Sequence, residues 1–77
     1  MEVKLICFGR IAEIIENKNI EISDITETDE FKIHIESLYP ALKTMKYKIA
    51  VNQELIQQNT PITSNAIIAL MPPFSGG

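Results

Sequence analysis

The C-terminal sequence MPPFSGG holds the residues of this chain whose types and spacing are best suited to chemistry. Pro72 and Pro73 favour an extended and stiff backbone, because the proline ring fixes φ and restricts the preceding residue. The six steps from Met71 to Gly77 span roughly 20 Å when extended, and Gly76 has no side chain that would clash in a narrow channel. The Gly77 carboxylate is therefore a candidate for activation as an acyl adenylate, followed by attack of a sulfur or nitrogen nucleophile.

No internal residue shows a comparable pattern. His34 is the only histidine, and no set of metal ligands accompanies it, which favours a surface or boundary position over catalysis. Cys7 lies in an apolar segment, where a buried thiol behaves as a small apolar side chain. The sequence contains neither a GxSxG turn nor a glycine-rich phosphate loop. We therefore expect no catalytic site, metal site or bound cofactor within the domain.

Length and charge limit the class of protein. The 77 residues suffice for one small domain, which fits a module that works by contact with a larger protein. The formal net charge is −3, from 7 basic and 10 acidic residues, and no basic run is interleaved with aromatic residues. Nucleic acid is therefore not expected as a partner. The absence of a secretory signal or a membrane-spanning run predicts a cytoplasmic protein with no membrane partner.

The segments that must position the tail predict a single α+β domain. Short apolar or alternating segments predict strands at residues 3–8, 19–23, 47–52, 54–58 and 66–71. A short amphipathic helix is expected at 10–16, and the main helix carries an apolar stripe of Phe31, Ile35, Leu38 and Leu42. The first and last strands are the most apolar, so we place them side by side and parallel in a mixed sheet of four to five strands. This layout is a β-grasp domain at 1–71, followed by an extended tail at 72–77.

Three segments, VKLICFGRIAEI, AVNQELI and IIALMPPFSGG, resemble the small subunit of molybdopterin synthase, the ubiquitin-like sulfur carrier of molybdenum cofactor biosynthesis. The resemblance covers essentially the whole chain and is most specific where the last strand runs into PP-x-S-GG. It implies that an E1-like enzyme uses ATP to adenylate Gly77, which then becomes a thiocarboxylate. Sulfur would pass to cyclic pyranopterin monophosphate within the large synthase subunit, forming the molybdopterin dithiolene. The chain would be the non-catalytic sulfur-donor subunit of a heterotetrameric enzyme.

The same resemblance implies which residues meet the partner. Gly76 would permit close passage through a channel, while Phe8 and Met71 would belong to an apolar patch on the sheet that packs against the large subunit. The implied tail contacts are Pro72, Pro73, Phe74 and Ser75.

The sequence departs from the family pattern in three places. TSNA stands where the family has an acidic Asp-Gly-Asp turn, and Asn65 can supply the left-handed conformation that glycine provides. Arg10 follows the first strand, but Ala12 stands where the family often has a second basic residue. Phe74 stands where valine is more common.

Alternative functions remain open at this point. The tail could deliver sulfur to thiamine or cysteine synthesis, or form isopeptide bonds with lysines as a ubiquitin-like protein modifier. The chain could also be a plain interaction module with an inert tail, for which C-terminal truncation would change no activity.

Overall fold

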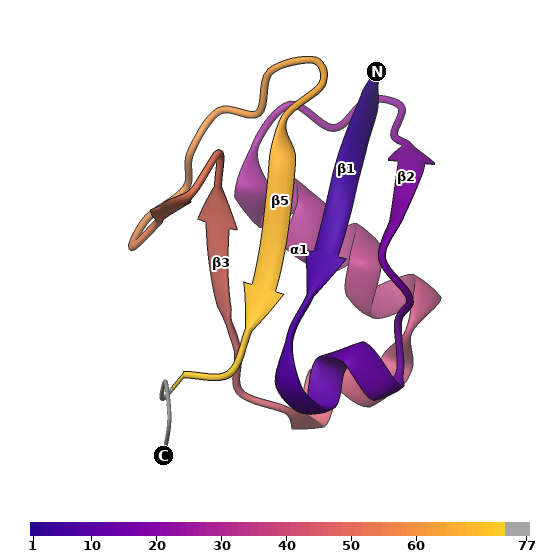
Figure 1. Ribbon diagram of the computed structural model, residues 1–77. Coiled ribbons are helices and arrows are strands. Elements are labelled where there is room, and N and C mark those ends of the chain that lie inside the picture. Colours follow the sequence, from indigo (N-terminus) through magenta and orange to yellow (C-terminus); the bar gives the residue numbers. More distant parts are fainter. Residues whose placement is uncertain (74–77) are drawn as a thin grey trace.

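A mixed five-stranded sheet carries the main helix on one of its two faces (Figure 1). The computed structural model describes residues 1–73 of the chain. Its elements are, in chain order, β1 (Glu2–Cys7), the 3-10 helix η1 (Gly9–Glu13), β2 (Lys18–Glu21), α1 (Thr28–Leu38), the 3-10 helix η2 (Pro40–Thr44), β3 (Lys48–Val51), β4 (Glu54–Leu55) and β5 (Ile67–Met71).

The strand order is β2-β1-β5-β3-β4, with the first and last strands of the chain adjacent at the centre. β1 and β5 pair in parallel, with Leu5 opposite Ile68 and Cys7 opposite Leu70. The other three pairings are antiparallel. The expected β-grasp arrangement and the central parallel pair are therefore confirmed.

Buried and more exposed side chains alternate along β1 and β5, so that one face of the sheet packs into the core. Val3, Leu5 and Cys7 are buried on the side of α1, and Ile68 and Leu70 of β5 are fully buried beside them. The helix contributes its own apolar side chains to the same cluster, with Phe31 and Ile35 both fully buried. Each such side chain stabilises the fold by about 1.5–3 kcal/mol through removal of apolar surface from water.

The main helix is shorter than its apolar stripe predicts. Leu38 is 55% exposed, so its expected place in the core is wrong, while Leu42 is buried from η2 instead. The helix ends at Leu38 because Pro40 cannot continue the hydrogen-bond ladder. At the other end, the Thr28 hydroxyl accepts a hydrogen bond of 2.9 Å from the Thr60 amide, which ties α1 to the loop before β5.

The segment after β1 is a 3-10 helix, where an amphipathic helix was expected at 10–16. Ile11 and Ile15 are buried as the pattern predicts, but Ile14 is exposed. The turns agree more closely with the sequence. Asn52 has φ 51° in the β3–β4 hairpin, and Asn65 has φ 65° before β5, so the left-handed conformation expected at Asn65 is confirmed.

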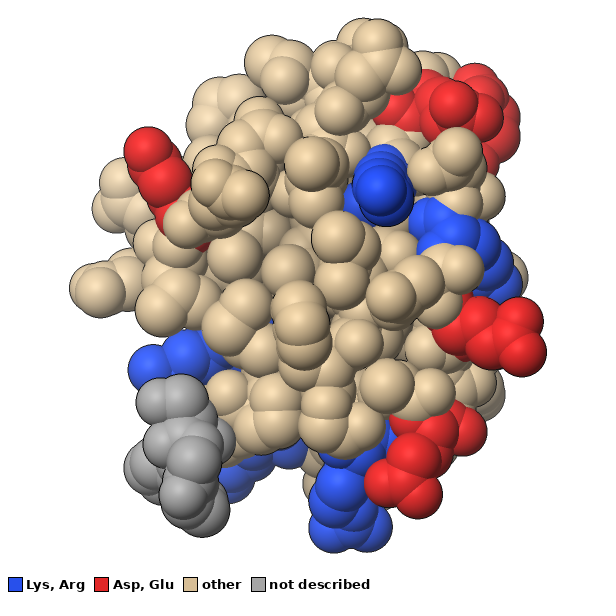
Figure 2. Space-filling view, viewed as in Figure 1, with Lys and Arg blue, Asp and Glu red and all other residues tan. Residues whose placement is uncertain are grey.

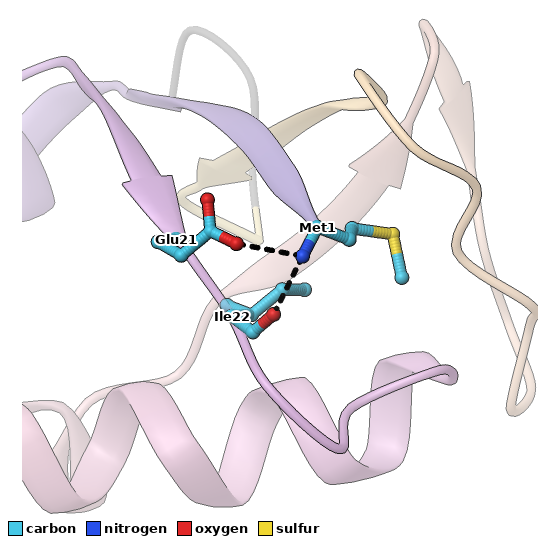
Figure 3. Close-up of polar contacts among 3 residues, drawn as sticks. All are labelled: Met1, Glu21 and Ile22. Atoms are coloured by element: carbon cyan, nitrogen blue, oxygen red, sulfur yellow. Dashed lines mark hydrogen bonds and ion pairs between the residues drawn. The ribbon is translucent and has the colours of Figure 1, made fainter.

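The amino group of Met1 joins the start of β1 to the end of β2 (Figure 3). It donates to Oε1 of Glu21 at 2.8 Å and to the carbonyl oxygen of Ile22 at 3.0 Å. Because Glu21 is well exposed, the ion pair contributes little, on the order of 0–1 kcal/mol. It lies at the end of the sheet opposite the one where β5 releases the chain.

Candidate functional site

The end of β5 is held on both sides by neighbouring strands. The Phe8 amide donates to the carbonyl oxygen of Leu70 at 3.0 Å, and Met71 pairs with Lys48 of β3. The polypeptide therefore leaves the sheet from a fixed position between β1 and β3. Pro72 and Pro73 follow and are only partly buried.

Pro72 lies directly against the turn that follows β1. Gly9 in that turn has φ +60°, and a Cβ added there would lie 2.6 Å from Cγ of Pro72. Glycine is suited to this position for two reasons, since it tolerates a positive φ and leaves room for the proline ring. Gly9 was not among the candidate site residues, and the sequence signal available was a lone internal glycine immediately after the first strand.

A hollow beside this contact is lined by Arg10, Ile11, Thr44, Met45, Lys46, Pro72 and Pro73. These residues come from η1, from the end of η2 and the segment that follows it, and from the start of the tail. We call this region the tail exit. The direction in which Pro72 leaves the sheet is thus set by its contact with the turn after β1.

The face of the sheet turned away from α1 is apolar and has nothing packed on it within the described chain. A shallow hollow of about 390 Å³ lies on it, lined by Ile6, Phe8, Ala50, Gln53, Leu55, Ile67, Ala69 and Met71. Phe8 is 49% exposed and Leu55 54% exposed. Figure 2 shows that most of the surface over β5 and β3 is uncharged, with charged side chains mainly around its margin. We call the apolar residues that line this hollow the open face, namely Ile6, Phe8, Ala50, Leu55, Ile67, Ala69 and Met71. Contiguous exposed apolar surface of this kind is typical of a protein–protein contact.

The structure brings some of the predicted site residues together. Phe8 and Met71 lie on the open face, and Pro72 and Pro73 lie at the tail exit beside it. Phe74, Ser75, Gly76 and Gly77 are outside the described residues. The roles assigned to all eight residues stay predictions.

Sequence reasoning missed the breadth of the open face. It named Phe8 and Met71 for the apolar patch on the sheet, but not Leu55, Ile67 or Ala69. The signal was present in β5, where the run IIALM is apolar at every position and so cannot have one polar face. Leu55 could not be found in this way, because β4 has only two residues.

The internal candidates are positioned as structural residues. Cys7 is buried in the core, and burial raises the pKa of its thiol, an effect that the nearby Lys18 ammonium only partly offsets. A raised pKa leaves little reactive thiolate at neutral pH. His34 is partly buried on α1. Within residues 1–73, no group of three or more His, Cys, Asp or Glu side chains could hold a metal ion. None of the helices in this range is long and apolar enough to cross a membrane.

Comparisons with known proteins agree with the fold. The ThiS family model matches residues 5–77. A molybdopterin synthase sulfur carrier subunit of Dictyostelium discoideum is 34% identical over 83 residues, covering 99% of this chain and 96% of that protein.

Two solved structures are similar along nearly their whole length. A Pyrococcus furiosus protein assigned as molybdopterin converting factor subunit 1 superimposes with a TM-score of 0.83 at 16% identity, covering 95% of this chain and 98% of that one. In a Helicobacter pylori complex of subunits 1 and 2 of molybdopterin-converting factor, the matching chain has a TM-score of 0.75 at 29% identity, with both chains fully covered. The chain therefore belongs to the ThiS family of β-grasp proteins, together with the molybdopterin synthase sulfur carrier subunit that it matches from end to end.

Proposed function

We propose that this chain is the sulfur carrier subunit of molybdopterin synthase. The observation that carries the proposal is the match to a sulfur carrier subunit over 99% of the chain, including the region of the terminal Gly-Gly. The geometry supports it independently, because a fixed tail exit adjoins an uncovered apolar face. A domain of this form can hold onto a larger protein while its tail enters that protein.

The chemistry would take place at the carboxylate of Gly77. An activating enzyme joins one carboxylate oxygen to the α-phosphate of ATP, releasing pyrophosphate and giving an acyl adenylate. Inorganic sulfide, or a persulfide together with a thiol reductant, then displaces AMP from the acyl carbon and leaves a thiocarboxylate. When sulfur passes to cyclic pyranopterin monophosphate, the carbon–sulfur bond breaks with addition of water and the carboxylate returns. Glycine is suited to each attack because no Cβ hinders the acyl carbon.

The open face would dock on the large synthase subunit. The complex of subunits 1 and 2 from H. pylori shows that a 29% identical chain assembles with a second subunit. Phe8 and Met71 lie on the open face close to the end of β5, so docking there would bring the base of the tail to the partner. Met71, Pro72 and Pro73 would then direct the tail into the large subunit, with Phe74, Ser75 and Gly76 along the channel.

The test is reconstitution of dithiolene formation with the large subunit. Deletion of Gly77 is expected to abolish sulfur transfer and leave the fold unchanged, because the tail lies beyond the last strand. Lys32→Ala is a matched control, since Lys32 is on α1 and away from the open face and the tail exit. The intact carrier should also show, by mass spectrometry, the mass increase of replacing one oxygen atom by sulfur.

Three kinds of result would contradict the proposal. The first is dithiolene formation with the Gly77-deleted chain or with a chain whose C-terminus is amidated. The second is a thiocarboxylate form that serves only thiamine or cysteine synthesis, or a carrier that is recovered attached through Gly-Gly to lysines of other proteins. A mature chain extending beyond residue 77 would equally overturn it, because the reacting carboxylate would then belong to another residue.

A further inference from the structure

Gly9 touches Pro72 just beyond the last hydrogen bond between β1 and β5. That hydrogen bond runs from the Phe8 amide to the carbonyl oxygen of Leu70, at 3.0 Å. Pro72 has no N–H and so cannot donate the next one. Packing takes its place, because the proline ring lies so close to Gly9 that an added Cβ would be 2.6 Å from Cγ and 3.3 Å from Cδ. The chain is thus held in position one residue past the end of β5.

The turn that carries Gly9 is itself anchored on both sides. Before it, the Cys7 amide donates to Oδ1 of Asn17 at 2.8 Å, which ties the end of β1 to the segment after η1. After it, Ile11 of η1 is buried in the core and also lines the hollow beside Pro72. The turn is therefore a fixed surface against which the proline ring is placed.

The position needs glycine for space as well as for its backbone conformation. A φ of +60° can also be adopted by asparagine, as Asn65 shows with a φ of 65°. An asparagine at position 9 would still carry the Cβ for which Pro72 leaves no room. The close approach of the proline ring is therefore the second reason for a glycine here.

We infer that Gly9 is a positioning residue for sulfur transfer, because it holds Pro72 and thereby directs the tail into the large subunit. The inference rests on the proposed function and adds a residue that belongs neither to the open face nor to the tail. Without this contact the domain could still dock, but the tail would leave the sheet over a wider range of directions. Freeing the backbone of one residue in this way should reduce the fraction of correctly directed tails by about fivefold to tenfold.

The experiment follows sulfur transfer in a complex that has already formed. Each carrier is prepared with a C-terminal thiocarboxylate by cleaving an intein thioester with sulfide. It is then mixed with saturating large subunit and cyclic pyranopterin monophosphate, and mass spectrometry gives the rate at which the thiocarboxylate becomes a carboxylate. Gly9→Ala is expected to lower this rate by about fivefold to tenfold. Its affinity for the large subunit should stay near the wild-type value, because the open face is intact.

Asn65→Ala is the matched control. It also forces an alanine into a positive φ, but at the other end of the sheet, where the Asn65 amide donates to the carbonyl oxygen of Glu2. It should lower the stability of the domain and leave the transfer rate at the wild-type value. Gly9→Asn keeps the test available if Gly9→Ala unfolds. Asparagine tolerates the positive φ and brings the same Cβ, so this variant should stay folded and transfer sulfur slowly.

Pro72→Ala separates the direction of the tail from the stability of the fold. It removes the Cγ and Cδ atoms that approach Gly9 and should itself slow transfer. In this background Gly9→Ala should still destabilise the domain through its φ, but should not slow transfer further, because the contact is already lost. A purely structural role of Gly9 predicts instead that the rate follows the folded fraction, which circular dichroism measures for each variant.

The outcomes distinguish this inference from the proposed function. If the wild-type thiocarboxylate reacts and folded Gly9→Ala reacts equally fast, Gly9 has no positioning role. The same conclusion follows if Asn65→Ala slows transfer as much as Gly9→Ala, or if the effect of Gly9→Ala persists in the Pro72→Ala background. If the wild-type thiocarboxylate does not react with the large subunit at all, the proposed function is wrong, and this inference falls with it.

Discussion

The two faces of the central sheet are both apolar, yet only one of them builds the domain. On the face toward α1, Leu5 and Leu70 have no exposed surface. On the open face, made by the alternate residues of the same strands, Phe8 and Leu55 keep about half of their surface in contact with solvent. The side chains with no exposed surface, which stabilise the domain most, lie on the first face. The apolar residues of the second face are therefore left available for a contact outside the described chain.

On the side of β1 that carries the open face, the residues change from charged to apolar along the strand. In β1 the residues on this side are Glu2 and Lys4 near the start, and Ile6 at the end, with Phe8 just beyond the strand. The charged end is near Met1, and the apolar end is next to the tail exit. Apolar surface is thus concentrated where a docked partner would have to receive the tail.

The sharpest test of this comparison uses two adjacent residues that point to opposite faces. Leu70→Asp places a carboxylate in the core and is expected to leave the domain unfolded. The free-energy cost of burying an unpaired charge is larger than the total free energy of unfolding of a small domain, about 5–10 kcal/mol. Met71→Asp should keep the fold and lose measurable affinity for the large subunit. Circular dichroism and titration calorimetry report the two effects. A folded Leu70→Asp chain would mean that the core assignment is wrong.

The same contrast can be measured with one substitution type. Phe31→Ala removes a fully buried ring and should lower the free energy of unfolding by about 3–5 kcal/mol. Phe8→Ala removes a half-exposed ring and should cost less than about 1 kcal/mol, since little surface is buried there. Urea denaturation measures both. For binding to the large subunit, Phe8→Ala should have the larger effect of the two substitutions. Its affinity should be lower than that of folded Phe31→Ala by more than about tenfold. Equal losses of stability would remove the distinction between the faces.

Much of this architecture could be predicted from local patterns. The parallel pairing of β1 and β5 followed from the two most apolar segments, and Asn65 was identified by its ability to adopt a positive φ. The strands predicted at 47–52 and 54–58 leave the β3–β4 turn at their junction, where Asn52 and Gln53 both have positive φ. In each case a short-range property of the sequence decides the outcome.

The errors arose where the chain changes direction. The apolar stripe of the main helix was predicted to continue through Leu38, but Pro40 ends the helix. Leu42 then reaches the core from η2, whose side chains do not continue the spacing of the α-helix. The expected helix at 10–16 is a tighter 3-10 turn that exposes Ile14. The contact between Pro72 and Gly9 depends on residues far apart in sequence, which only the folded chain brings together. The expected roles of the residues from 74 onward remain untested predictions.

Gly9 lies beside the tail exit, in contact with Pro72, and a smaller effect is expected there. Gly9→Ala forces an alanine into φ +60° and places its Cβ against Pro72, so the free energy of unfolding should fall by about 1–3 kcal/mol. Pro72→Ala removes the Cγ and Cδ atoms that make the closest contacts. In that background the cost of Gly9→Ala should drop to the backbone part, about 1–2 kcal/mol. Additive losses in the double variant would show that the two residues do not press on each other.

The smallest expected effect concerns a polar contact on the helix side, which has no counterpart on the open face. The Tyr47 hydroxyl donates to Glu36 of α1, and burial, followed by the adjacent Glu36 carboxylate, raises the pKa of Tyr47 well above its usual value. Because the raised pKa belongs to the folded state, this contribution is present below about pH 10 and is lost at higher pH, where the unfolded chain releases the proton first.

Tyr47→Phe should therefore lower the free energy of unfolding by about 0.5–1.5 kcal/mol at neutral pH, and the difference from wild type should shrink above pH 10. Urea denaturation as a function of pH measures it, with Tyr39→Phe as the control for the other tyrosine. Affinity for the large subunit should not change, because Tyr47 is not part of the open face. A binding loss in Tyr47→Phe would mean that the helix side also carries partner contacts, and the division between a structural face and a docking face would fail.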